Sequence, residues 1–155
     1  MTGVQTCALP IWTEAAKLQV PDRPNETTVR FLANGDAMML IRRETGDKQA
    51  WIGTAKAPYR DWKFTPAGFQ IGGPNFIELP DGTIIGGGRD YRHSPKNTTM
   101  IGTLTPSAFS PSLNLPSAGD NSYPGFVWFK DRLWTSYYST HEGKTSIYLA
   151  KIARR

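Results

Sequence analysis

Two arginines and a tyrosine in this sequence have the spacing and the chemistry of a ligand site. Arg42 follows the turn glycine Gly35 by seven residues, and Arg89 follows Gly82 by the same interval. Two guanidinium groups at equivalent positions could bind one carboxylate, since each donates parallel charge-assisted hydrogen bonds. Tyr123 lies in a third segment of similar composition. A tyrosine next to a carboxylate can act as a nucleophile when that carboxylate takes its proton.

The elements that must position these residues are short strands joined by glycine turns. The segment 72–89, GGPNFIELPDGTIIGGGR, predicts two antiparallel strands around Asp81-Gly82, because an Asp-Gly pair between β-rich runs is a strong hairpin signal. Comparable hairpins are predicted at 27–42 and 123–138. Further apolar runs extend each hairpin, so that the predicted strands are 27–32, 37–41, 49–54, 62–65, 75–79, 83–87, 98–104, 111–115, 125–129, 133–138 and 146–152.

The hairpins recur at a nearly constant interval. Gly35 and Gly82 are 47 residues apart, and the corresponding turn at Lys130-Asp131 follows 48 or 49 residues later. Repeats of about 40 to 50 residues with four short strands each are typical of β-propeller blades. The sequence therefore predicts an all-β fold, a partial β-propeller of about three four-stranded antiparallel blades, the last with only three strands. Its expected parts are a connecting loop at 12–26 and blades at 27–71, 72–117 and 118–155. A single β-sandwich could also hold these strands.

Composition limits the classes of function. The chain has 155 residues and a net charge of +5, but its Lys and Arg residues are scattered and do not form the basic stripe of a nucleic-acid-binding protein. No window approaches the roughly eighteen apolar residues of a membrane-spanning helix. Only two His and one Cys are present, so a zinc site is not expected. The net positive charge fits an anionic small ligand. We expect neither a nucleic acid partner nor a membrane span.

The first eleven residues, MTGVQTCALPI, resemble the translation of a common sequencing-adapter read. We therefore expect 1–11 to be foreign to the natural protein, which removes the only cysteine, Cys7, from disulfide or thiol chemistry. We also expect the natural chain to begin further upstream. These residues would then be the C-terminal part of a longer protein, and any signal peptide would lie in the missing part.

Blade geometry predicts where the polar side chains meet. The innermost strand of a blade starts at one face and the second strand returns to that face. Residues just before the first strand and just after the second therefore converge near the propeller axis. Arg43 alternates away from Arg42 and is expected to be exposed. The candidates at the converging positions are Glu26 and Arg42 in the first blade, Asn75 and Arg89 in the second, and Asp120 and Tyr123 in the third.

Three of these segments resemble the sialidase superfamily, the six-bladed propellers with BNR or Asp-box repeats. The segment 26–42, ETTVRFLANGDAMMLIR, is similar to the family segment that carries a glutamate and one arginine of a carboxylate-binding triad. The segment 81–89, DGTIIGGGR, resembles the one with a later triad arginine, and 120–125, DNSYPG, the one that presents a nucleophilic tyrosine. The end of the chain, from Ser122, is very like the final blade of proteins called exo-α-sialidases.

This resemblance implies a function and a role for each candidate residue. Tyr123 would be the catalytic nucleophile and Glu26 its base, Arg42 and Arg89 would bind the substrate carboxylate, and Asn75 and Asp120 would also bind substrate. The implied enzyme is a retaining glycoside hydrolase that cleaves terminal α-linked sialic acid, or a related acidic sugar, from glycoconjugates. It needs no metal and no organic cofactor, and its parent protein would be secreted or periplasmic.

The sequence departs from the family pattern in two respects. No intact Asp box, S-x-D-x-G-x-x-W, is present, and the nearest segment, TAKAPYRDW at 54–62, keeps the final Trp but loses the Asp and Gly. The first triad arginine and the aspartate acid/base belong to early blades that this sequence lacks, so we expect the fragment to be inactive alone. Two other functions stay open: a non-catalytic carbohydrate-binding or scaffold propeller, and a propeller enzyme acting on other glycans.

Overall fold

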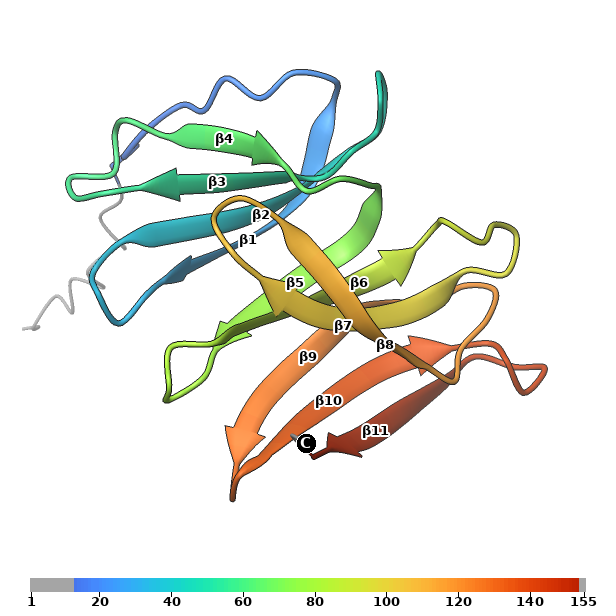
Figure 1. Ribbon diagram of the computed structural model, residues 1–155. Coiled ribbons are helices and arrows are strands. Elements are labelled where there is room, and N and C mark those ends of the chain that lie inside the picture. The colour runs from blue at the N-terminus through green and yellow to red at the C-terminus, as the bar shows by residue number, and fades with distance from the viewer. Residues whose placement is uncertain (1–12, 154–155) are drawn as a thin grey trace, which may run out of the picture.

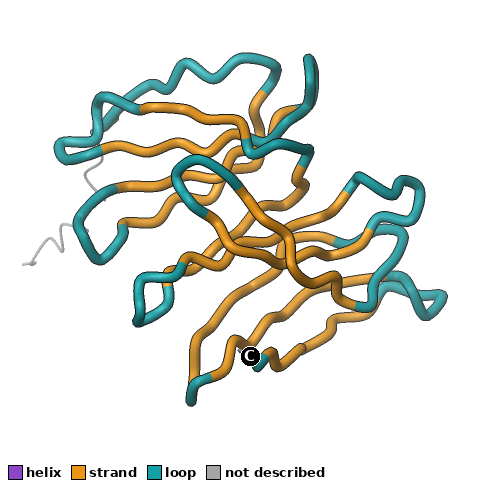
Figure 2. The backbone as a smooth tube through the Cα atoms, in the orientation of Figure 1, coloured by secondary structure: helices purple, strands orange, loops and turns teal. Residues whose placement is uncertain are grey.

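The computed structural model describes residues 13–153, so the adapter-like segment 1–11 and Cys7 lie outside the described residues. Every regular element between residues 13 and 153 is a β-strand, and the strands form three successive sheets (Figures 1 and 2). No helix in this range is long and apolar enough to cross a membrane. The all-β prediction is confirmed.

Each sheet is an antiparallel meander in which strands pair in chain order. The first sheet contains β1 (Pro24–Phe31), β2 (Ala37–Arg43), β3 (Trp51–Ala55) and β4 (Lys63–Pro66). The second contains β5 (Ile71–Glu78), β6 (Ile84–Asp90), β7 (Thr98–Leu104) and β8 (Phe109–Leu115). The third contains β9 (Ser122–Phe129), β10 (Arg132–Ser139) and β11 (Ser146–Ile152).

The three sheets lie side by side as neighbouring blades. Figure 1 shows them one after another from the top of the view to the bottom, and the first strand of the second sheet, β5, contacts both β1 and β9. The first strands of the sheets are therefore the innermost ones. Three small meanders around one side differ from two sheets packed face to face, so the β-sandwich alternative is wrong.

Equivalent turns close the first hairpin of each blade. In the first two blades Gly35 and Gly82 adopt φ values of 84° and 82°, and their N–H groups donate to the carbonyls of Leu32 and Leu79 at 2.8 and 2.9 Å. Positive φ costs glycine little, which explains why glycine recurs there. The third blade uses Lys130 and Asp131, both with positive φ, as two-residue hairpin turns of the primed type require.

Apolar side chains fill the two junctions between blades. The junction of the first two blades is centred on Phe76, Met38, Leu40 and Met100, all with 0% exposure. The junction of the second and third blades contains four buried residues, Ile101, Leu115, Leu133 and Tyr137, and many partly buried ones. Burial of this apolar surface supplies the main driving force that orients each blade against the next.

The innermost strands begin earlier than the sequence predicts, at the end of each blade where the candidate site residues lie. β1 begins at Pro24, inside the predicted connecting loop, and β5 and β9 begin at Ile71 and Ser122 rather than at 75 and 125. Each extension contains a β-bulge, in which two residues of the innermost strand lie opposite one residue of its neighbour. The doubled residues are 25 and 26 in β1, 73 and 74 in β5, and 123 and 124 in β9.

Candidate active site

The three bulges meet at the carboxylate of Glu26. Its Oε2 atom accepts hydrogen bonds from Arg42 Nη1 at 2.8 Å and from the Gly73 backbone N–H at 2.7 Å. Its Oε1 atom accepts a hydrogen bond from the Tyr123 hydroxyl, 97 residues along the chain. Each blade thus contributes one group to the same carboxylate. A bulge re-aims side chains that a regular pleat would direct elsewhere, and here it directs them to one point.

The surroundings of Glu26 keep it ionised. Partial burial opposes ionisation, but the hydrogen bonds from Arg42, Tyr123 and the Gly73 N–H outweigh it, and the pKa of Glu26 is lowered. The pKa of Tyr123 is raised, because its hydrogen bond to Glu26 and its partial burial both favour the neutral phenol. The resting pair is therefore a neutral phenol that donates to a carboxylate, which is the arrangement of a nucleophile and its base.

Tyr123 is held in an unusual backbone conformation. Its φ is +52°, a region that non-glycine residues seldom adopt, and its side chain lies at the surface with 58% of the residue exposed. Such strain concentrates at functional sites, where surrounding contacts maintain it. The exposed ring leaves the hydroxyl accessible to a ligand while Glu26 holds it in place.

Gly73 is required by the close approach of the third blade. Its φ is +52°, and a Cβ at this position would lie 2.1 Å from Ser122 Oγ and 2.7 Å from the Tyr123 backbone nitrogen. Any larger residue would push Tyr123 away from Glu26. The absence of a side chain at Gly73 therefore allows the Tyr123 hydroxyl to approach the Glu26 carboxylate.

Arg42 and Arg89 lie on the same face, as their equal spacing predicts, and share one aromatic neighbour. Their guanidinium carbons lie 5.9 and 5.7 Å from the centroid of the Tyr91 ring. Arg42 also forms an ion pair with Glu44 at 2.6 Å. Both arginines keep raised pKa values: burial opposes their charge, but Glu26 stabilises Arg42, and Tyr91, Tyr138 and Asp120 stabilise Arg89. Both cations thus lie close to the same aromatic ring.

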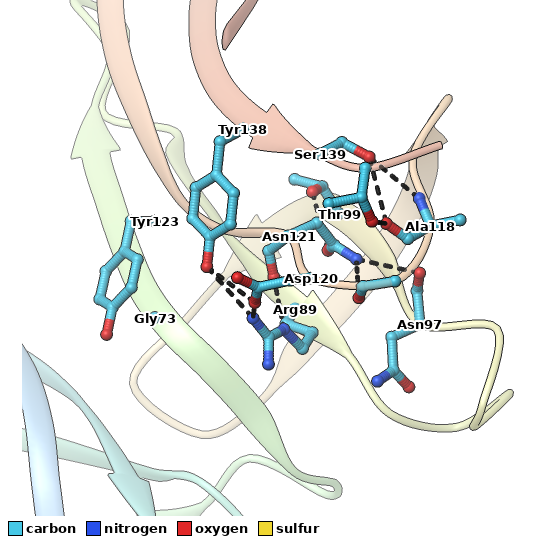
Figure 3. Close-up of polar contacts among 12 residues, drawn as sticks. Gly73, Arg89, Asn97, Thr99, Ala118, Asp120, Asn121, Tyr123, Tyr138 and Ser139 are labelled. Carbon is cyan, nitrogen blue, oxygen red and sulfur yellow. Dashed lines mark hydrogen bonds and ion pairs between the residues drawn. The ribbon is translucent and has the colours of Figure 1, made fainter. Parts of the chain in front are cut away.

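Arg89 is anchored to the loop that leads to Tyr123. Its Nε donates to the backbone carbonyl of Asn121, and its Nη2 pairs with Asp120 at 2.5 Å and lies 3.2 Å from the Tyr138 hydroxyl (Figure 3). Asn121 is fully buried, and its amide bonds the carbonyls of Asn97 and Gly119. The loop is therefore held to the second blade by polar contacts, and it presents Asp120 and Tyr123 beside Arg89.

The remaining sequence predictions have mixed outcomes. Asn75 uses its amide to bridge blades: its Nδ2 donates to the Pro124 carbonyl at 2.8 Å and its Oδ1 accepts from Arg30 at 3.0 Å. Its role in substrate binding stays a prediction. The expectation that Arg43 is exposed is wrong, since the residue is 2% exposed and pairs with Asp22 and Asp47. These carboxylates come from the preceding and following loops and enclose the guanidinium.

Sequence reasoning missed two aromatic residues of the site, Tyr91 and Tyr138. Tyr138 occupies in the third blade the place of Arg42 and Arg89, because it follows Arg89 by 49 residues, the interval between the turns. Extending the repeat by one blade would have found it. The residue after each of these positions, Arg43, Asp90 or Ser139, is buried in every blade. Tyr91 has no such signal, since it follows the second strand in a loop.

Comparison with known proteins identifies the fold. No protein-family model matches the chain, and no curated protein has a similar sequence. A protein of unknown function from Dyadobacter fermentans matches 93% of this chain with a TM-score of 0.77 and 24% identity, over 42% of its own length. An α-L-arabinanase from Penicillium chrysogenum matches 84% of this chain with a TM-score of 0.69 and 12% identity, over 46% of its own length.

An α-L-arabinofuranosidase from Fusarium graminearum gives the same TM-score of 0.69 at 10% identity, with 84% of this chain matched to 45% of that enzyme. The chain thus spans less than half the length of each of these structures. Its fold is a β-propeller of the type found in glycoside hydrolases. The likeness extends to the fold, and the chemistry has to be argued from the site itself.

Proposed function

We propose that this chain supplies the nucleophile side of a retaining, exo-α-sialidase-like glycoside hydrolase. The observation that carries the proposal is the hydrogen bond from Tyr123 to Glu26, whose carboxylate is fixed by Arg42 and the Gly73 N–H. A glycosidase-type propeller supports an action on glycans. Because the matched part of this chain covers less than half of each of those structures, we also propose that the working enzyme contains further blades of the same polypeptide.

The choice of nucleophile follows from the substrate. Sialic acid carries a carboxylate on its anomeric carbon, so a carboxylate nucleophile would meet electrostatic repulsion. A neutral tyrosine avoids that repulsion, and sialidases are the glycosidases that use one. Tyr123 is neutral at rest and exposed, as this role requires.

In the first step the Tyr123 oxygen forms a bond to the anomeric carbon while its proton passes to Glu26 Oε1. The glycosidic bond breaks, and its electron pair leaves on the aglycone oxygen. That oxygen takes a proton from the aspartate that the family resemblance assigns to an early blade. In the second step the aspartate, now a carboxylate, takes a proton from water as the water oxygen bonds the same carbon, and the leaving Tyr123 oxygen takes its proton back from Glu26. Two displacements retain the configuration.

A second candidate function is hydrolysis of a neutral glycan by the same propeller. Each arginine of the site is already paired with a protein carboxylate, Arg42 with Glu26 and Glu44, and Arg89 with Asp120. These three carboxylates offset the two positive charges. The matched Penicillium structure is an α-L-arabinanase complexed with arabinobiose, and the Fusarium structure is an α-L-arabinofuranosidase. Arabino-oligosaccharides are therefore the appropriate competing substrates.

The test is an assay of the full-length protein with a fluorogenic α-sialoside and with arabino-oligosaccharides. We expect turnover of the sialoside, and a decrease in kcat of roughly a thousandfold or more for Tyr123→Phe, since the nucleophile is lost. Tyr59→Phe is the matched control, because its hydroxyl bonds the Gly35 carbonyl at the opposite end of the first blade.

The possible results separate the alternatives. Sialoside turnover that survives Tyr123→Phe would keep the enzyme and reject the tyrosine nucleophile. Turnover of arabino-oligosaccharides alone would favour the neutral-glycan enzyme. Sugar binding with no turnover of either substrate would favour a non-catalytic carbohydrate-binding propeller.

A further inference from the structure

The carboxylate of Asp120 is bound in the way a ligand carboxylate would be. Its Oδ1 atom accepts a hydrogen bond from Arg89 Nη2 at 2.5 Å and another from the Tyr138 hydroxyl at 3.1 Å. Figure 3 shows the Tyr138 hydroxyl directed at Arg89 and Asp120, with the Tyr123 ring beside it. A guanidinium N–H and a phenol O–H that converge on one oxygen are strong, directional donors for a carboxylate.

The two donors are positioned by contacts other than those with Asp120. The Arg89 Nε donates to the Asn121 carbonyl, and Asn121 is itself buried with its amide fully used. Tyr138 lies in β10, and its ring is stacked on the Tyr123 ring with centroids 6.5 Å apart and planes 24° apart. The donors therefore stay in place if Asp120 moves away.

Asp120 is the exposed member of this group. Its side chain is 64% exposed, whereas that of Arg89 is 18% exposed. Exposed ion pairs contribute little free energy, because water competes for both charges. The pair of Arg89 and Asp120 is therefore weak enough for a carboxylate from solution to replace it.

We propose that Asp120 is an internal ligand in a carboxylate-binding position formed by Arg89 and Tyr138, and that the substrate carboxylate displaces it. Tyr138 is then a substrate-binding residue, and Asp120 competes with substrate rather than binding it. The inference rests on the proposed function, because it assumes a substrate with a carboxylate. It also explains selectivity, since a neutral sugar offers nothing that replaces the Asp120 carboxylate on Arg89.

The experiment is an NMR titration of the whole chain with N-acetylneuraminic acid and, as the neutral probe, its methyl ester. Four proteins are compared, wild type, Asp120→Ala, Asp120→Asn and Tyr138→Phe, together with the double variant that combines Asp120→Ala with Tyr138→Phe. We expect both Asp120 variants to bind the acid about two- to fivefold more tightly, which is the range of an exposed ion pair. Tyr138→Phe should bind the acid more weakly, alone and combined with Asp120→Ala. The ester should bind equally to all four.

Asp131→Asn in the β9–β10 turn and Tyr59→Phe are the matched controls, and both should bind the acid as wild type does. Equal or weaker binding of the acid by both Asp120 variants would overturn the proposal, while wild-type preference for acid over ester would leave the proposed substrate class intact. Equal binding of acid and ester by every protein would instead reject the carboxylate substrate, and this inference with it. Sialoside turnover that survives Tyr123→Phe affects neither outcome, because that variant tests the nucleophile alone.

Discussion

The junction between the first two blades and the junction between the second and third hold the same site with different contacts. In the first, the central side chains Phe76, Met38 and Met100 are 0% exposed. In the second, fewer residues are buried, and aromatic rings such as Tyr137 and Tyr148 stack with centroids 5.3 Å apart. Hydrogen bonds of the loop around Asn121 supplement this packing. The first junction therefore depends more on close apolar packing than the second does.

The site-end contacts differ in the same way. At the first junction Glu26 is 22% exposed, and its ion pair with Arg42 is joined by a backbone N–H from the second blade. At the second junction Arg89 pairs with Asp120, which is 64% exposed. The less exposed pair includes Glu26, the proposed base for Tyr123, and that role would require a constant geometry. The more exposed pair lies where we propose that the substrate carboxylate binds. We infer that the first junction keeps the geometry around Glu26 fixed, and that the second junction allows Asp120 to be exchanged for a ligand.

The largest effect is expected at the centre of the first junction. Phe76→Ala should lower the free energy of unfolding by about 3–5 kcal/mol, because it removes a fully buried ring and leaves a cavity. Urea unfolding followed by tryptophan fluorescence measures the change. Phe129→Ala is the matched control, since Phe129 is 54% exposed and its loss should cost less than about 1 kcal/mol.

A smaller effect is expected at the second junction. Leu133→Ala should lower the free energy of unfolding by about 2 kcal/mol, at the low end for a buried leucine, because its neighbours are partly exposed and can relax into the space. The same urea experiment compares it with Phe76→Ala. A loss as large as that of Phe76→Ala would contradict the comparison and show that both junctions are equally well packed.

Regular features of these junctions could be predicted from sequence, and irregular ones could not. Alternation and turn glycines predicted all the strands, and the interval from Gly35 to Gly82 placed Arg42 and Arg89 on one face. The bulge that contains Glu26 was not predicted, because a bulge depends on which residues pair across strands rather than on local composition. Glu26 was therefore predicted to lie in a loop.

Burial of a charged side chain was the other feature that could not be predicted from sequence. Arg43 was expected in solvent because it alternates with Arg42. Instead it forms ion pairs with Asp22 and Asp47 from two loops, and its guanidinium carbon lies 4.5 Å from the centroid of the Trp51 ring. Strand periodicity describes two faces and says nothing of loops that fold over one of them. Tyr91 was not predicted for the same reason, since its place beside both arginines is determined by tertiary packing.

The smallest expected effect is the contribution of Glu26 to acid stability. Burial of Glu26 is outweighed by its hydrogen bonds with Arg42, Tyr123 and Gly73, so its pKa in the folded protein lies below the ordinary value of 4.5. The unfolded chain then binds more protons than the folded chain in this pH range, and stability rises with pH there. The contribution is complete above the unfolded pKa and disappears as pH falls through the folded pKa.

Glu26→Gln should therefore flatten the decline in stability below pH 4.5, while leaving its form near neutral pH unchanged. Urea unfolding midpoints of wild type and Glu26→Gln, measured from pH 3 to pH 7, test this. Because the Glu26–Arg42 pair is less exposed than the Asp120–Arg89 pair, Glu26→Gln should lower the free energy of unfolding at pH 7 more than Asp120→Asn does. If Asp120→Asn has the larger effect, the second junction holds the stronger ion pair, and the proposed exchange of Asp120 for substrate loses its physical basis.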